Sequence, residues 1–157
     1  MEMQMEFIRK LPTPAELKEQ FPLDPELKRL KNRRDREIRD IFEGRDKRLI
    51  LIIGPCSADR EDAVLDYMHR LAKVQEKVID RIFMIPRVYT NKPRTKGTGY
   101  KGMLHQPDPH KNEDVLAGII AIREMHTRVA RETGFTCAAA GTILDSGLIS
   151  AFCAAAS

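Results

Sequence analysis

Five basic residues follow one another between positions 87 and 101 with no acidic residue among them. They are Arg87, Lys92, Arg94, Lys96 and Lys101, and Gly97 and Gly99 lie among them, with Gly102 directly after Lys101. A guanidinium group matches the geometry of carboxylate and phosphate, and a lysine ammonium adds a mobile point charge. Glycines let backbone amides approach an anion closely. The segment predicts an oxyanion-binding loop, with a solvated basic loop as the alternative; it matches neither a Walker A loop nor GxGxxG.

A cysteine lies just after an apolar run, in the tetrapeptide Gly54-Pro55-Cys56-Ser57. A thiol at the end of a buried strand can be a soft metal ligand or a nucleophile, and inert packing is the alternative. Cys56, Cys137 and Cys153 are odd in number and far apart, so neither a disulfide framework nor a CxxC zinc site is indicated.

None of the four histidines has the spacing of a metal-binding motif. His69 and His126 fall in predicted helices, where a surface or packing role is expected. His105 and His110 flank residues 106–109, where they could face the loops or shape a turn.

Short apolar runs alternate with amphipathic segments along most of the chain. The predicted strands are Leu49–Ile53, Ile82–Ile85 and Phe135–Ala138, and the predicted helices are one capped by Asp59 and one from Val115 that ends near Gly134. Leu49–Ile53 is expected to be buried on both faces, and residues 86–102 are expected to form a long loop. Strand, helix and strand in this order predict a βαβ unit and therefore a parallel sheet.

Two helices are predicted before the first strand. The first carries Thr13 as N-cap, Pro14 at its first position and Glu16 for a capping box, and the second runs from Asp24-Pro25 to Glu43 with Gly44 as its left-handed terminal residue. The second helix is strongly basic. Its residues Arg33, Arg34, Arg36 and Arg39 are expected on a solvated or subunit-contacting face, with nucleic-acid binding as the alternative.

The 157 residues are 42% hydrophobic and 32% charged, with a net charge of +4, which is typical of a globular domain and compatible with anionic ligands. No apolar run approaches the roughly 18–20 residues of a membrane span, and residues 1–6 lack the features of a signal peptide. These features predict a cytoplasmic protein with no membrane contact.

The ordered set of motifs resembles class I 3-deoxy-D-arabino-heptulosonate 7-phosphate synthase. The matching segments are Leu11–Pro14, Glu37–Ile41, Gly54–Ser57, Arg87–Tyr89, Lys92–Thr95 and Tyr100–Gly102, within residues 7–138. The resemblance implies a (β/α)₈ barrel that condenses phosphoenolpyruvate with erythrose 4-phosphate, the first step of aromatic amino-acid biosynthesis. It also implies a divalent metal cation that polarises the aldehyde, and a homo-oligomer.

The resemblance assigns roles to individual residues. Arg87, Lys92 and Lys101 match the positions that bind phosphoenolpyruvate, with Arg87 and Lys92 in the catalytic set. Lys92, Pro93, Arg94 and Thr95 match the sugar-phosphate loop, and Cys56 matches the metal-binding cysteine.

Three strand candidates are fewer than the eight strands of such a barrel, and the family's other metal ligands come from later strands. We therefore expect a helical extension over 1–46, a partial barrel over 47–138 and an atypical tail over 139–157. A truncation with a frame-shifted tail is the hypothesis, and it predicts a chain that is inactive alone. A non-catalytic regulatory or assembly fragment is a further alternative.

Overall fold

The structure is a computed structural model that describes residues 10–55, 57–91 and 99–139. Its elements, in chain order, are α1 (Pro14–Gln20), α2 (Pro25–Phe42), β1 (Leu49–Ile53), α3 (Glu61–Val78), β2 (Ile82–Val88), α4 (Val115–Thr133) and β3 (Ala138–Ala139).

The two N-terminal helices begin at the predicted caps. The hydroxyl of Thr13 accepts a hydrogen bond from the Glu16 amide at 3.3 Å, and the Glu16 carboxylate accepts one from the Thr13 amide at 2.6 Å. Asp24 caps α2 by accepting a hydrogen bond from the Leu27 amide at 2.8 Å. Past the end of α2, Gly44 has a φ of 74°, so the left-handed residue is confirmed.

The strands form a parallel sheet in the order β1-β2-β3, which confirms the α/β class and the parallel pairing. Leu49 is paired with Ile82 and Ile53 with Pro86, while Arg87 is paired with Ala138. Strand β3 begins three residues later than predicted. The Phe135 amide donates instead to the Thr133 hydroxyl at 3.4 Å, so the chain leaves α4 through a local turn before it joins the sheet.

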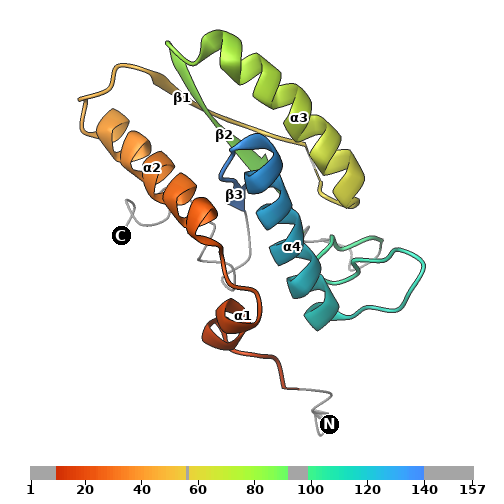
Figure 1. The fold of residues 1–157 in the computed structure, drawn as a ribbon. Helices are drawn as coiled ribbons and strands as arrows, with labels where there is room; N and C mark the ends of the chain where they lie inside the picture. Colours follow the sequence, from red (N-terminus) through yellow and green to blue (C-terminus); the bar gives the residue numbers. More distant parts are fainter. Residues whose placement is uncertain (1–9, 56, 92–98, 140–157) are drawn as a thin grey trace, which may run out of the picture.

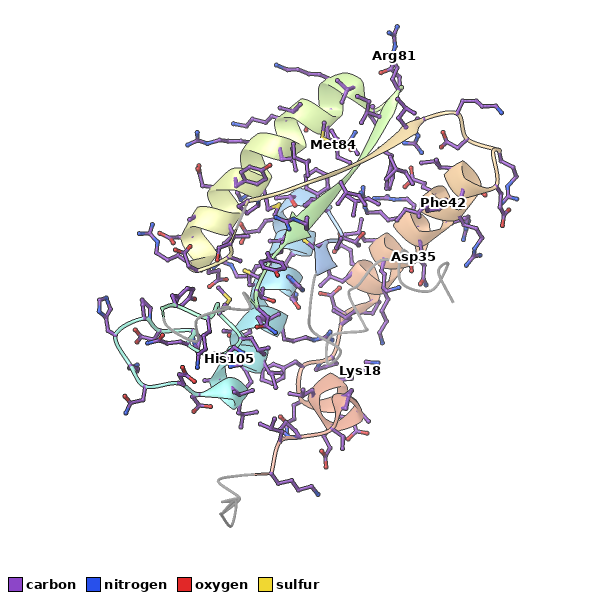
Figure 2. All side chains as sticks on the ribbon, turned by 180° about the vertical axis from the view of Figure 1, so that it is seen from behind. Lys18, Asp35, Phe42, Arg81, Met84 and His105 are labelled. Carbon is purple, nitrogen blue, oxygen red and sulfur yellow. The ribbon has the colours of Figure 1, made fainter. Side chains whose placement is uncertain are left out.

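Helices cover both faces of the sheet (Figure 1). Phe83 and Ile85 pack with Ile38 of α2 on one face. Met84 and Val88 lie on the other face, in the core formed with α3 and α4, and Figure 2 shows Met84 between the strand and α3. The alternation of side chains along β2 thus places α2 opposite α3 and α4.

The expected burial of Leu49–Ile53 on both faces is wrong for the part of the chain that the structure describes. The side chain of Leu49 is 72% exposed and that of Leu51 is 37% exposed. β1 is an edge strand because its only partner among the described strands is β2, and α2 covers part of one face. The apolar run therefore predicted the strand correctly, but it did not predict the exposure of its side chains.

Two predicted boundaries near the loops are also wrong. Helix α3 has Arg60, not Asp59, at its N-cap position, with no side-chain cap bond. The Ala58 amide is held by the Tyr89 carbonyl at 2.9 Å, which keeps the chain extended past Asp59. Strand β2 continues through Pro86 to Val88, because Arg87 and Val88 pair with β3; Arg87 is therefore a strand residue rather than a loop residue.

Candidate anion-binding site

The segments that follow β1 and β2 meet at one edge of the sheet. Parallel strands end at the same edge, and that edge is where α/β folds place their ligands. Arg87 is the second-to-last residue of β2. Its Nη2 donates a hydrogen bond to the carbonyl oxygen of Pro55 at 3.1 Å. The side chain with the predicted anion-binding role is thus fixed to the segment that carries Gly54, Pro55 and Ser57.

The contact between the two segments requires a glycine at position 54. A Cβ atom added there would lie 1.8 Å from the carbonyl oxygen of Arg87, far inside any real contact. Gly54 therefore lets the backbone after β1 lie directly against the backbone of β2. The first residue of the Gly-Pro-Cys-Ser motif has a packing role that sets the distance from this motif to Arg87.

The guanidinium group of Arg87 also lies 5.3 Å from the centre of the Tyr89 ring, within the range of a cation–π contact. Arg87 is half-buried. The described bond to Pro55 uses one of its nitrogens, and an arginine has five N–H donors in a planar fork. Held on two sides, Arg87 is preorganised to bind a carboxylate or phosphate group.

The two ends of the segment after β2 are joined by a backbone hydrogen bond. The Leu104 amide donates to the carbonyl oxygen of Thr90 at 3.1 Å. Gly99 and Gly102 have φ values of 91° and 103°, which favour glycine, so two of the three predicted glycines serve the backbone turn.

Lys101 forms an ion pair with Glu113, with Nζ 3.0 Å from Oε1. Both side chains are more than one third exposed, so the pair is weak and an anionic ligand can compete with it. Glu113 is absent from the predicted site. It lies twelve residues further along the chain, and no spacing rule indicates that contact.

Tyr100 and Asp59 also come together between the two segments. Burial, and then the negative charge of Asp59, raises the pKa of the Tyr100 phenol. Tyr100 thus stays protonated at neutral pH. Asp59, predicted as a helix cap, instead contributes charge to the site.

Five of the seven predicted site residues lie outside the described residues. They are Cys56, Lys92, Pro93, Arg94 and Thr95. The structure brings Arg87 to Pro55, the residue before Cys56, and places Lys101 at the far end of the second segment.

The residues that the structure describes do not fit a metal ion by themselves. Across 10–55, 57–91 and 99–139, no three His, Cys, Asp or Glu side chains gather into a possible metal site. The backbone of His105 lies in a turn, where its carbonyl oxygen accepts from the Asp114 amide at 2.9 Å, and His69 contacts Glu132 at 2.9 Å.

The expectation that Arg34 lies on a solvated face is wrong. Its side chain is 6% exposed and donates from Nη2 to the Met84 carbonyl at 2.6 Å, and its guanidinium lies 4.2 Å from the centre of the Phe83 ring. Burial lowers the pKa of Arg34 to about 10. Helical spacing contained the signal, because Arg34 falls four residues before Ile38 and seven after Leu27, in the buried stripe of α2.

No helix among the described residues is long and apolar enough to cross a membrane.

Comparison with known proteins gives the class of this chain. Residues 15–153 match the model of the DAHP synthetase I family. The match includes most of 139–157, the segment expected to be atypical. The chain belongs to this family, and the resemblance drawn from its motifs is confirmed.

Two relatives show the extent of the sequence similarity. The chain is 37% identical over 107 residues to the phenylalanine-inhibited phospho-2-dehydro-3-deoxyheptonate aldolase of Saccharomyces cerevisiae, covering 68% of this chain and 28% of that protein. It is 36% identical over 115 residues to the Tyr-sensitive enzyme of that name from Escherichia coli, covering 73% and 32%. The chain thus spans about a third or less of the length of these two relatives.

A solved structure has the same fold over most of this chain. The phospho-2-dehydro-3-deoxyheptonate aldolase of Francisella tularensis superimposes with a TM-score of 0.77 at 27% identity. The superposition covers 87% of this chain and 39% of the other.

Proposed function

We propose that this chain forms part of the active site of a 3-deoxy-7-phosphoheptulonate synthase. The reaction is the condensation of phosphoenolpyruvate with D-erythrose 4-phosphate to 3-deoxy-D-arabino-heptulosonate 7-phosphate and phosphate. Family membership supports the reaction class. The observation that carries the proposal for this chain is the position of Arg87, fixed by Pro55 where the segments after β1 and β2 meet.

The substrates explain the excess of basic residues at this edge. Together they bring two phosphates and one carboxylate, and each needs charge-assisted hydrogen bonds. We assign Arg87, Lys92 and Lys101 to phosphoenolpyruvate, and Lys92, Pro93, Arg94 and Thr95 to the phosphate of the sugar. In this assignment phosphoenolpyruvate displaces Glu113 from Lys101.

Carbon–carbon bond formation joins C3 of phosphoenolpyruvate to the aldehyde carbon, water adds at C2, and phosphate leaves. Arg87 and the lysines hold both substrates with the reacting carbons adjacent, which lowers the entropic part of the activation free energy of the condensation. A divalent cation would polarise the aldehyde. Cys56 is the ligand that we propose from this chain, and the described residues do not supply the further ligands.

The architecture we propose is the first part of a (β/α)₈ barrel over 47–138, preceded by a helical extension over 1–46. Two helices precede an alternation of strands and helices, and the strands pair in parallel, which supports this division. The extension is joined firmly to the sheet, because Arg34 reaches both the Met84 carbonyl and the Thr136 hydroxyl. A homo-oligomer of the longer protein is part of the proposal.

The reaction is tested with a chimera in which the aligned 115 residues of this chain replace the corresponding segment of the Escherichia coli relative. Disappearance of phosphoenolpyruvate is followed with erythrose 4-phosphate and manganese present. We expect turnover by this chimera and loss of turnover on Cys56→Ala or Arg87→Gln. A folded chimera without turnover, or one whose turnover survives Cys56→Ala, contradicts the proposal.

A further inference from the structure

A groove lies between α2 and the C-terminal end of α4, helices that lie side by side (Figure 1). Its volume is about 690 Å³, and four arginines line it: Arg29, Arg33, Arg36 and Arg131. A volume of this size suits a small molecule. None of these residues belongs to the candidate site at the ends of the strands.

Three of the arginines form a row along α2. Arg29, Arg33 and Arg36 are spaced by four and three residues, so their side chains lie on one face of the helix. A rise of about 1.5 Å per residue spreads the row over roughly 10 Å. That length exceeds a single phosphate group and fits two anionic groups on one ligand.

The row is not neutralised within the part of the chain that the structure describes. Arg29, Arg33 and Arg36 are exposed, and none has a described side-chain hydrogen bond or ion pair there. Neighbouring basic residues do have acidic partners, such as Lys31 with Asp35 and Arg48 with Glu37. Three adjacent cations without a described counter-ion repel one another, and an anion bound between them would remove that repulsion.

An exposed ion pair joins the wall opposite the row to the start of α2. Arg131 of α4 lies 3.0 Å from Asp24, the residue that also caps α2. The Leu27 amide and then Arg131 lower the pKa of Asp24, so the bridge is charged at neutral pH. Because α2 and α4 also contact one another, the groove is present without a ligand, and binding needs to order only side chains.

We propose that this groove binds a small dianion, namely a molecule that carries two phosphate or carboxylate groups. Two apolar residues, Leu27 and Leu30, also line the groove, which suits a short carbon skeleton. Nucleic acid fits less well. Asp24 and Glu26 line one end of the groove and would repel a continuing phosphate backbone, and burial of Arg34 interrupts the basic run.

The groove shares none of its lining residues with the site assigned to phosphoenolpyruvate. Gly134 lines the groove and lies four residues before Ala138, the residue of β3 that pairs with Arg87. Arg87 lies where β2 ends. Figure 2 shows the two ends of the molecule, with Arg81 before β2 at one end and His105 in the loop region at the other.

The test is a titration of the ¹⁵N-labelled full chain with fructose 1,6-bisphosphate and with inorganic phosphate, followed by amide shifts. We expect saturable shifts at Leu30 and Gly134, with the bisphosphate at least tenfold tighter than phosphate. Arg33→Gln/Arg36→Gln is expected to weaken this binding at least tenfold. Arg39→Gln, an exposed arginine of the same helix outside the groove, is the matched control and should bind as the wild type does.

Three results would overturn the proposal. Shifts confined to residues 87–91 and 99–104 would mean that the anion binds only at the loops. An equal loss of affinity for the bisphosphate in Arg39→Gln and in the double variant would mean that the anion is attracted by net charge alone. Tighter binding of a random DNA duplex than of the bisphosphate, lost in the double variant, would mean a nucleic-acid surface. Unchanged thermal unfolding of each variant separates these results from misfolding.

Discussion

Arg34 is a cation in the interior of the protein, and its contacts explain how it can be there. A carbonyl oxygen and a hydroxyl accept from its guanidinium, and the Phe83 and Phe135 rings lie at 4.2 and 5.4 Å from it. Buried charges are tolerated only with such compensation. The single side chain therefore links α2 to β2 and to the segment before β3.

Removal of Arg34 is expected to destabilise the fold. Arg34→Ala leaves the Met84 carbonyl and Thr136 hydroxyl without this donor and removes the ring contacts, at a cost of about 2–4 kcal/mol. Urea denaturation measures the change in the free energy of unfolding. Arg39→Ala, exposed on the same helix, should cost less than about 0.5 kcal/mol. Equal effects of the two substitutions would show that the described contacts of Arg34 do not stabilise the protein.

For single residues, the sequence predicted contacts between near neighbours better than contacts between distant segments. The caps at Thr13 and Asp24 were predictable because their partners lie three residues away. Arg34 depends on Met84 and Thr136, which are distant in sequence. The charge of Arg34 predicted a solvent-exposed side chain, and only its place in the apolar stripe of α2 indicated burial.

The elements around the candidate site are held together by backbone contacts. Gly54 lies against Arg87, and the Ala58 amide bonds to the Tyr89 carbonyl. Similarly, a Cβ at Gly118 of α4 would lie 2.0 Å from the Leu104 carbonyl oxygen. Close backbone contacts at Gly54 and Gly118, where a side chain would not fit, thus fix the two loop segments.

Gly54→Ala should therefore separate β1 from β2 at the site. The added methyl group overlaps the Arg87 carbonyl, and relief of that overlap requires a backbone shift that costs about 1–3 kcal/mol. Thermal unfolding and the amide shifts of Arg87 and Tyr89 measure the two effects.

Gly44→Ala is the matched control for Gly54→Ala. It introduces strain at a φ of 74° but meets no atom within 4 Å, so it should leave the shifts of Arg87 and Tyr89 unchanged. If Gly54→Ala also leaves these shifts and the stability unchanged, the close approach is not required.

Strand and helix positions were predictable from apolar periodicity, whereas their ends were not. Pro86 suggested the start of a loop, yet β2 continues because β3 supplies partners to Arg87 and Val88. Asp59 suggested a cap, yet a bond from Ala58 to Tyr89 holds the chain extended there. Both boundaries are set by long-range pairing that local patterns do not contain.

Over the described residues, the molecule is a parallel sheet with helices on both faces, and its edge strand β1 is partly exposed. The parallel order followed from the alternation of strands and helices, and the family followed from its motifs. The exposure of β1 could not be predicted, because an apolar run does not reveal how many neighbours it has. The candidate site shares this limit: Arg87 and the loop after it were predicted from composition, while the contacts of Glu113 and Asp59 appear only in the fold.

The central claim is that Arg87 binds phosphoenolpyruvate where the segments after β1 and β2 meet. The most direct measurement is titration of the ¹⁵N-labelled chain with phosphoenolpyruvate, comparing wild type, Arg87→Gln and Arg81→Gln. Arg81 is a highly exposed arginine just before the same strand, so it controls for net charge. We predict saturable shifts at Tyr89 and Gly99 at millimolar ligand in wild type and Arg81→Gln, with at least tenfold weaker binding in Arg87→Gln. No response of the folded wild type at millimolar ligand, or equal binding by Arg87→Gln, would contradict the account.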